Sequence, residues 1–210
     1  LLLHIRIREK MGKSEKLNLG CGSDYREGFV NVDYDKSVKA DLYFDLQNKF
    51  PLKDHTFDFV VAQDVLEHFT KEDATKFIKE ISRILKSKGK VEVRVPNVYE
   101  ILDKFYSDPL VVMHFLYGDT TQGILGAHKY GYTEKILKKL FSVNGFNNIQ
   151  IKKQDTNFVV TATKSVIPAH AGIHTNNIMI SLQDSGGLGG AENFILWLSR
   201  SLEDKGNKLS

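Results

Sequence analysis

Short apolar runs alternate with segments of helical periodicity from about residue 16 to residue 164, and this alternation constrains the fold most strongly. The runs that we predict to be strands cover residues 16–19, 29–32, 57–62 and 90–95. Strands that alternate with helices are typical of a mostly parallel sheet with helices on both faces. The sequence therefore predicts an α/β fold.

The clearest helical pattern covers residues 72–86. Its apolar positions at helical spacing are Phe77, Ile78, Ile81, Ile84 and Leu85. Thr70 precedes the pattern and pairs with Asp73 as a capping combination. Gly89 follows and is expected to stop the helix.

A second helix is predicted over residues 134–143, with Gly145 behind it as a C-terminal stop. Two further runs, residues 149–153 and 158–163, are separated by a few polar residues and indicate a hairpin. This hairpin would add antiparallel strands at one end of the sheet.

The composition divides the chain into unequal parts. We expect an N-terminal extension without functional content over residues 1–15, a main domain over 16–163 and a linker over 164–177. Residues 178–210 then begin a new unit with the order strand, glycine-rich loop, helix. A lone domain normally needs about 40 residues, so this tail is not a complete fold.

Charge and cysteine content exclude several classes of function. The net charge is +3 and the lysines are spread among acidic residues, which does not favour a nucleic-acid-binding protein. Cys21 is the single cysteine, so no internal disulfide is possible, and we expect a cytoplasmic location. The opening leucines 1–3 are interrupted at once by His4, so we expect neither a signal peptide nor a membrane span.

Gly20, Cys21 and Gly22 follow the first predicted strand, and Asp33 ends the second. Glycines at this place let a ligand approach the backbone, and the amides of a following helix could hold an anion. Tyr25 stands where a dinucleotide site has its third glycine. A ligand with one carboxylate and a ribose, such as S-adenosylmethionine (SAM), does not need a full pyrophosphate-binding loop. Asp33 can accept hydrogen bonds from its ribose diol. The alternative is two ordinary strands joined by an ordinary turn.

The same region resembles class I SAM-dependent methyltransferases, in particular small bacterial members found among polysaccharide-biosynthesis genes. The matching stretches, in the order of the family, are LNLGCG (17–22), GFVNVD (28–33), ADLYFDL (40–46), FDFVVAQDVLEHF (57–69) and HKYGYTEKILKKLFSVNGF (128–146). The resemblance implies a Rossmann-like fold and SAM as the cofactor. The interval from Gly20 to Asp33 is short for this class, which requires a brief or irregular first helix.

The resemblance also implies roles for individual residues. The cofactor residues that it implies are Leu19, Gly20, Cys21, Gly22, Asp33, Asp45, Leu46, Gln63, Asp64 and Val65. Among them, Asp33 would bind the ribose and Asp45 the exocyclic amine of adenine. Asp45 could equally be a plain strand flank. Cys21 is interpreted as a backbone-contact residue and not as a nucleophile, because no activating base is close in sequence.

The segment 118–133 is the richest candidate for the acceptor side. Its glycines would allow a mobile lid, His128 is a candidate catalytic base, and Tyr130 and Tyr132 are candidate substrate contacts. Alternatively, the tyrosines pack at a loop–helix junction and His128 faces solvent. Glu67 and His68 lack the H-E-x-x-H spacing, so His68 is interpreted as a capping or packing residue and no metal is expected.

The tail resembles the extreme N-terminus of GT-B glycosyltransferases, through Gly189, Gly190, Ala191 and Glu192 and the later Lys205, Gly206 and Asn207. This resemblance implies a glycan context and a possible link to a glycosyltransferase. The leading hypothesis is SAM-dependent methyl transfer to a hydroxyl of a sugar or glycan intermediate. The alternatives are a truncated glycosyltransferase fusion and a non-catalytic scaffold with a SAM-binding fold.

Overall fold

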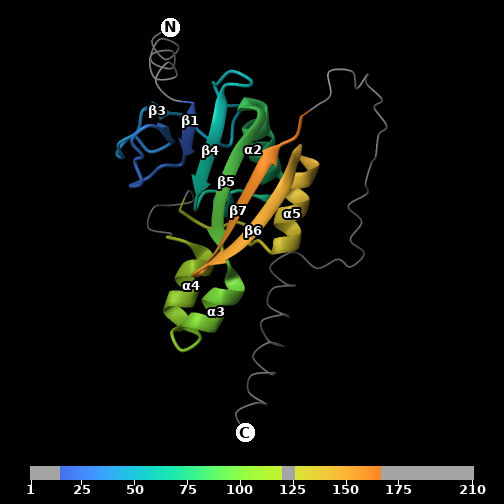
Figure 1. The fold of residues 1–210 in the computed structure, drawn as a ribbon. Coiled ribbons are helices and arrows are strands. Elements are labelled where there is room, and N and C mark those ends of the chain that lie inside the picture. The colour runs from blue at the N-terminus through green and yellow to red at the C-terminus, as the bar shows by residue number, and fades with distance from the viewer. Residues whose placement is uncertain (1–14, 120–125, 167–210) are drawn as a thin grey trace. The chain divides into compact units, whose positions relative to one another are not determined.

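The structure is a computed structural model, and it describes residues 15–119 and 126–166. Its strands are β1 (Lys16–Leu19), β2 (Val30–Asp33), β3 (Leu42–Tyr43), β4 (Phe57–Gln63), β5 (Leu85–Pro96), β6 (Phe146–Gln154) and β7 (Asn157–Lys164). These form one seven-stranded sheet in the order β3-β2-β1-β4-β5-β7-β6 (Figure 1).

The first five strands run parallel, whereas β7 pairs antiparallel with both β5 and β6. The predicted α/β fold, mostly parallel and Rossmann-like with a terminal antiparallel hairpin, is therefore confirmed. β1 has the predicted bounds, and the other predicted strands shift or lengthen by a few residues. β3 has two residues, and the pattern of apolar runs did not predict it.

Helices α2 (Lys71–Ile84) and α5 (Glu134–Val143) lie next to each other against one face of the sheet (Figure 1). Helices α3 (Val98–Phe105) and α4 (Pro109–Tyr117) pack on each other near the carboxyl ends of the parallel strands. Among the described residues, α2 and α5 thus cover one face of the sheet, whereas helices were expected on both faces.

The sequence analysis did not predict α3 and α4. Apolar residues occur on every side of α4, including Leu110, whose side chain is 82% exposed, so no helical period is visible. The first helix, which was expected to be brief or irregular, has no helical turn in the structure. Residues 20–29 instead form turns that lead directly from β1 to β2.

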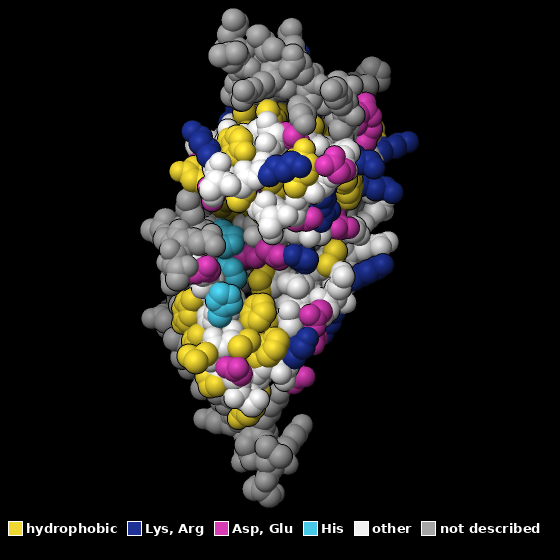
Figure 2. Space-filling view, turned by 90° about the vertical axis from the view of Figure 1, so that its left-hand side faces the viewer, with side chains coloured by type: hydrophobic (Ala, Val, Ile, Leu, Met, Phe, Trp, Pro, Cys, Tyr) yellow, Lys and Arg dark blue, Asp and Glu magenta, His cyan; other side chains and the backbone are white. Residues whose placement is uncertain are grey.

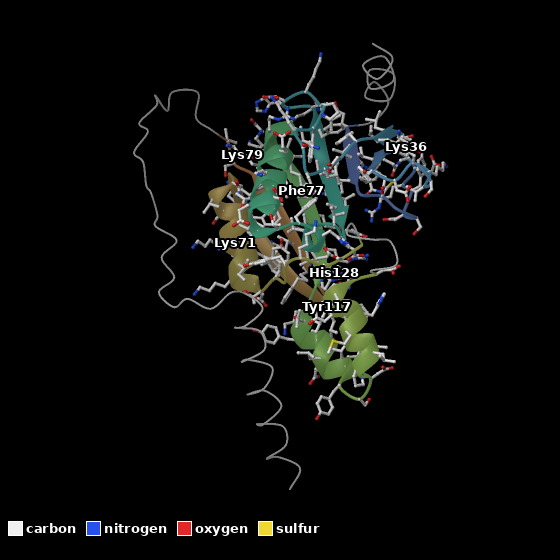
Figure 3. All side chains as sticks on the ribbon, turned by 180° about the vertical axis from the view of Figure 1, so that it is seen from behind. Lys36, Lys71, Phe77, Lys79, Tyr117 and His128 are labelled. Carbon is white, nitrogen blue, oxygen red and sulfur yellow. The ribbon has the colours of Figure 1, made fainter. Side chains whose placement is uncertain are left out.

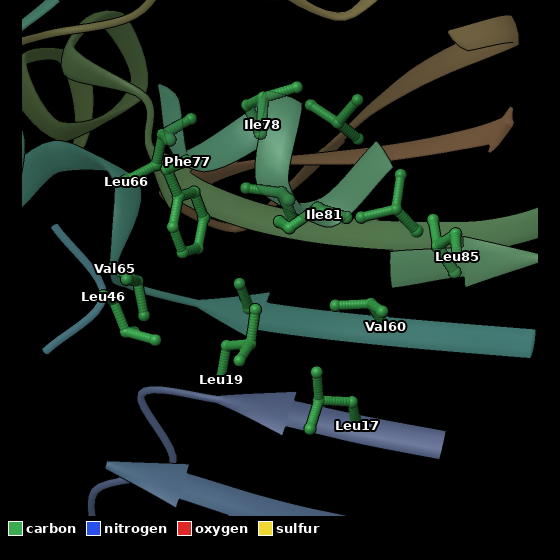
Figure 4. Close-up of a cluster of buried hydrophobic side chains, with 14 of the residues drawn as sticks. Leu17, Leu19, Leu46, Val60, Val65, Leu66, Phe77, Ile78, Ile81 and Leu85 are labelled. Atoms are coloured by element: carbon green, nitrogen blue, oxygen red, sulfur yellow. The ribbon is translucent and has the colours of Figure 1, made fainter. Parts of the chain in front are cut away.

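The core lies between the sheet and helices α2 and α5. Strand register places Leu17, Val30, Val60, Val91 and Ala162 in one row on the same face, and all are buried. Side chains of α2 pack onto this surface (Figure 4). The buried residues that α2 contributes are Ala74, Phe77, Ile78, Ile81 and Ile84. The helical spacing of these residues in the sequence therefore reflects one buried face.

The predicted helix caps are present. Thr70 Oγ1 accepts from the Asp73 amide at 3.2 Å and donates to the Asp73 carboxylate, as a capping pair does. Gly145 follows α5 with φ of +85°, in the left-handed region that glycine favours. In contrast, α2 ends at Ile84, well before Gly89, because β5 begins at Leu85.

The N-terminal extension, most of the linker and the whole tail lie outside the described residues, as does part of the segment 118–133. Their predicted boundaries stay predictions. Among the described residues, no helix combines the length and the apolar character that crossing a bilayer requires.

Candidate functional site

The carboxyl ends of β1, β2 and β4 meet at one edge of the sheet, where ligands of open α/β sheets normally bind. The turn after β1 contains Gly20, with φ of +65°, and Gly22, with φ of +48°. The amide of Cys21 donates to the Val32 carbonyl at 3.0 Å and holds the turn beside β2. Main chain therefore forms this surface, without a helix N-terminus behind it.

Asp33 ends β2 and faces this turn. Its Oδ2 accepts from the Gly22 amide at 2.7 Å, and its Oδ1 accepts from the Asp35 amide at 2.9 Å. Each carboxylate oxygen can accept a second hydrogen bond, so a diol can still bind Asp33. The structure thus brings together the glycine turn and the acid that the sequence analysis paired.

Gly20 also lies against Val65, which follows β4 two residues after its end. A Cβ built on Gly20 would lie 2.5 Å from Val65 Cγ2, so the close approach of Val65 requires glycine here. Gln63, the last residue of β4, is half-buried, and Asp64 has a left-handed φ of +55°. We name Leu19 to Gly22, Asp33 and residues 63–65 the cofactor side.

Asp64 forms a two-point ion pair with Arg94 of β5. Asp45 accepts from the Gln47 amide at 2.8 Å and from the Asn48 side chain at 3.0 Å, which is a turn arrangement. These contacts favour the strand-flank alternative for Asp45, and contact of Asp45 with adenine stays a prediction. Leu46 is 8% exposed and belongs to the apolar core.

The Cys21 thiol is buried, and its Sγ lies 3.6 Å from the Lys39 carbonyl. Burial, reinforced by the negative charge of Asp33, raises the pKa of this thiol to about 11. A thiol with this pKa is a poor nucleophile at neutral pH, and the role of Cys21 as a backbone-contact residue stays a prediction.

Asp41 and Asn31 belong to a network that the sequence analysis did not anticipate. Asp41 accepts from the Tyr25 hydroxyl at 3.0 Å and from the Asn31 amide at 2.9 Å. The Asn31 side chain, which is buried, accepts from the Arg26 amide at 2.9 Å. Tyr25, at the place of the missing third glycine, therefore ties the turn segment to β2.

Residues 66–68 and 126–132 form a second part of the site, which we name the acceptor side. The short helix η1 (Leu66–His68) follows Val65 directly. The Glu67 carbonyl accepts from the amides of Lys129 and Tyr130, at 2.8 and 3.2 Å. The His128 amide donates to the Tyr117 carbonyl at 3.0 Å, so the same segment is also fixed to the end of α4. Figure 3 shows His128 where the sheet meets α3 and α4.

His128 and His68 stand edge to face, with ring centroids 4.9 Å apart. The Nδ1 atom of His68 lies 3.2 Å from the Ala127 carbonyl, and that of His128 lies 2.9 Å from the Phe115 carbonyl. Burial, reinforced by His68, lowers the pKa of His128 and favours the neutral ring. Figure 2 shows histidine side chains gathered on one face beside acidic and basic groups. His128 is thus half-buried and does not simply face solvent.

Glu67 is the residue whose importance the sequence analysis missed. Its side chain is 2% exposed, and its Oε2 has no hydrogen-bond partner among the described residues. Burial raises the pKa of Glu67 to about 8. A buried carboxylate oxygen without a partner is rare and marks a place where a ligand or ion is to be sought. The signal in the sequence was the adjacent pair of Glu67 and His68, which was set aside because the H-E-x-x-H spacing is absent.

The two tyrosines differ in their surroundings. Tyr132 is 3% exposed, and its hydroxyl donates to the Leu66 carbonyl at 3.1 Å, so the structure favours the packing alternative for this residue. Burial raises the pKa of Tyr132 above its ordinary range. Tyr130 is half-buried and stands edge to face against Tyr132. Tyr130 stays a predicted substrate contact.

The fold is that of class I SAM-dependent methyltransferases, with the glycine turn and Asp33 at the expected edge of the sheet. Residues 17–93 match the family described as "Methyltransferase domain". This part of the chain is therefore similar to a methyltransferase domain, and the match and the fold together support SAM as the cofactor.

The relatives found among known proteins are distant. An uncharacterized protein of Methanocaldococcus jannaschii is 28% identical over 127 residues, which cover 53% of this chain and 55% of that protein. The chain thus spans about half the length of this curated relative.

Solved structures agree in fold. A SAM-dependent methyltransferase of Archaeoglobus fulgidus has a TM-score of 0.53 at 16% identity, over 78% of this chain and 93% of that one. One from Methanosarcina mazei has a TM-score of 0.52 at 19% identity, over 72% and 92%. A possible histamine N-methyltransferase of Thermotoga maritima has a TM-score of 0.51 at 15% identity, over 77% and 95%. At these identities the likeness establishes the fold alone.

Proposed function

We propose that this domain binds SAM on the cofactor side and transfers its methyl group to a hydroxyl of a small polar acceptor, of which a sugar or glycan intermediate is the favoured kind. The observation that carries the proposal is the Asp33 carboxylate, which lies 2.7 Å from the Gly22 amide at the carboxyl edge of the parallel sheet. A carboxylate and bare main chain at this edge fit the ribose and the amino-acid end of SAM.

SAM supplies an electrophilic methyl group on a sulfonium, so the protein mainly has to align the acceptor. Val65 contacts Gly20 on the cofactor side, and η1 begins at the next residue. Glu67 and His128 are therefore close to the place where an acceptor would meet the methyl group. Polar groups at such a place suit a hydroxyl acceptor, which needs a group that takes or weakens its proton.

The preference for a sugar or glycan is supported by the resemblance of residues 178–210 to the start of a GT-B glycosyltransferase. No finding from the comparisons bears on that resemblance. The preference for a sugar acceptor is tested by incubating the full chain with methyl-labelled SAM and an extract of the source cell. Label in a methyl ether of a carbohydrate fraction supports the preference, and label only in amines or proteins contradicts it.

Cofactor binding is tested by calorimetry with SAM on the full chain. Asp33→Ala removes the acceptor for the ribose diol, and we expect the affinity to fall at least about tenfold, the scale of losing hydrogen bonds to a charged group. Asp35→Ala is the matched control, because both oxygens of this exposed carboxylate accept from Ser37. Equal affinity in the two variants would reject the role of Asp33. SAM binding without transfer to any hydroxyl acceptor would support the scaffold alternative.

A further inference from the structure

We infer that Glu67, His68 and His128 form a binding site for one divalent transition-metal ion on the acceptor side. One possible ligand atom from each of the three residues lies within 4.8 Å of the others. A carboxylate with two imidazoles is a ligand set that Zn²⁺, Fe²⁺ and Co²⁺ accept. The existence of the site is independent of the proposed function, whereas its role in transfer rests on that function.

The two histidines are held in the form that binds metals. Each Nδ1 lies at hydrogen-bond distance from a backbone carbonyl, that of Ala127 for His68 and that of Phe115 for His128. A carbonyl accepts only, so these contacts favour the tautomer that has the proton on Nδ1 and the lone pair on Nε2. A carbonyl behind a ligating imidazole is the usual outer partner of a metal ligand.

Glu67 supplies the independent evidence for an ion. Within the described parts of the chain, its Oε2 is buried without any hydrogen-bond donor. Arg94, whose charge reaches Glu67, is paired with Asp64 and makes no hydrogen bond to that oxygen. A cation between Glu67 and the histidines would supply the partner that this buried oxygen lacks.

The backbone assembles the site before any ion binds. The hydrogen bonds from Lys129 and Tyr130 to the Glu67 carbonyl hold the segment of His128 against η1. Ligands at about 2.0–2.2 Å from one ion lie roughly 3–4 Å apart, so small side-chain rotations close a spacing of 4.8 Å. Only modest reorganisation is therefore needed.

Three protein ligands would leave room for the acceptor hydroxyl, and an ion there would lower the pKa of that hydroxyl, as catalytic zinc does for water. The hydroxyl oxygen would then lose its proton to solvent and form a bond to the methyl carbon of SAM. The carbon–sulfur bond would break with its electron pair on sulfur, which gives a methyl ether and S-adenosylhomocysteine.

The test uses the full chain, stripped with a chelator and then titrated with Co²⁺ by visible absorption and with Zn²⁺ by calorimetry. We expect one equivalent to bind. Glu67→Gln and His128→Asn each remove a ligand, so each should weaken binding at least about tenfold, since even changes at outer partners cost 10–100-fold. His55→Asn is the matched control, because His55 lies at the other edge of the sheet with φ of +54°, which asparagine tolerates.

Binding that survives in both variants, or that His55→Asn weakens equally, would overturn the inference. Should Glu67→Gln fail to fold by circular dichroism, His128→Asn decides alone, since His128 is only half-buried. SAM calorimetry on the same samples separates the two proposals. A wild-type chain that binds SAM but no metal overturns this inference only, and one that binds metal but no SAM overturns the proposed function only.

Discussion

The cofactor side and the acceptor side lie next to each other but are assembled in different ways. On the cofactor side, the bond between Gly22 and Asp33 spans 11 positions of the sequence and joins the turn after β1 to the end of the neighbouring strand β2. On the acceptor side, the contact between His68 and Ala127 spans 59 positions and the one between Tyr132 and Leu66 spans 66.

This difference predicts how substitutions on each side affect the structure of the site. The cofactor side depends on one local conformation of a short turn, so a single added atom can disrupt it. The acceptor side depends on a segment fixed at two ends, to η1 and to α4. We therefore expect variants on either side to affect their own ligand more than the ligand of the other side.

The largest effect is expected for Gly20→Ala. The new Cβ would overlap Val65 Cγ2, which lies 2.5 Å from the ideal position, and φ at this residue is +65°. A left-handed alanine costs about 1–2 kcal/mol and overpacking adds about 1–3 kcal/mol of unfolding free energy. Urea denaturation measures this loss, and calorimetry should show SAM affinity at least about tenfold lower because the turn is displaced.

Gly28→Ala separates strain from overlap. Gly28 has φ of +78°, but a Cβ there would meet nothing within 4 Å. This variant should show only the smaller loss of stability and unchanged SAM affinity. The double variant Gly20→Ala, Val65→Ala should regain part of the lost stability. Equal losses for Gly20→Ala and Gly28→Ala would show that the contact with Val65 does not matter.

The same difference explains what could be predicted from the sequence. β1, Asp33 and the Thr70 cap depend on residues close in the chain, so local patterns located them. The pairing of Glu67 with His128 depends on backbone hydrogen bonds from Lys129 and Tyr130, and no spacing rule covers such a distance.

Other features were wrong or missed for physical reasons. Helix α4 was not predicted because its apolar residues show no period, although Asp108 caps it by accepting from the Val111 amide. The helix expected after β1 is replaced by turns, which Asp41 and Asn31 stabilise with side-chain hydrogen bonds. Hydrophobic periodicity does not reveal that side-chain hydrogen bonds, and not a helix, stabilise the segment between β1 and β2.

A comparable loss of stability, with an effect on ligand binding that is confined to the acceptor side, is expected for Gly118→Ala. A Cβ on Gly118 would overlap the Gly126 carbonyl and lie 2.8 Å from His128 Cδ2, and φ is +75°. The bridge between Gly118 and Ala127 would open and His128 would shift. In urea denaturation we expect the left-handed alanine to cost about 1–2 kcal/mol and the overlap to add about 1–3 kcal/mol. Co²⁺ affinity should fall, while SAM affinity stays within about twofold because the sides are held separately.

Gly131→Ala is the matched control in the same segment. Its φ is not positive, and a Cβ would meet only Val98 Cγ2 at 4.0 Å. This variant should keep both affinities. If Gly118→Ala lowers SAM affinity as much as Gly20→Ala does, the two sides are coupled and the comparison fails.

The smallest effect is expected at the opposite edge of the sheet, where a change should leave both sides of the site intact. Lys164, the last residue of β7, is 5% exposed, and its ammonium donates to the Leu85 carbonyl at 2.7 Å. Burial lowers the pKa of Lys164 from its ordinary value of 10.5. The fold thus disfavours the charged form, so Lys164→Met should raise the unfolding free energy by up to about 1 kcal/mol at pH 7.

The pH dependence gives this prediction a sign. Below the folded-state pKa the lysine is charged in both states, and the full cost of burying the ammonium is present. As the pH rises from the folded-state pKa towards 10.5, the folded protein loses the proton first, so this cost disappears and the wild-type chain gains stability. Urea denaturation between pH 7 and 10 should therefore show that the stability advantage of Lys164→Met shrinks as the pH rises.

Lys152→Met on β6 is the control, because that lysine is exposed and its replacement should not change how stability depends on pH. A stability advantage of Lys164→Met that grows with pH would show that the charge of Lys164 stabilises the fold. A change in SAM affinity would show that this edge of the sheet is coupled to the cofactor side.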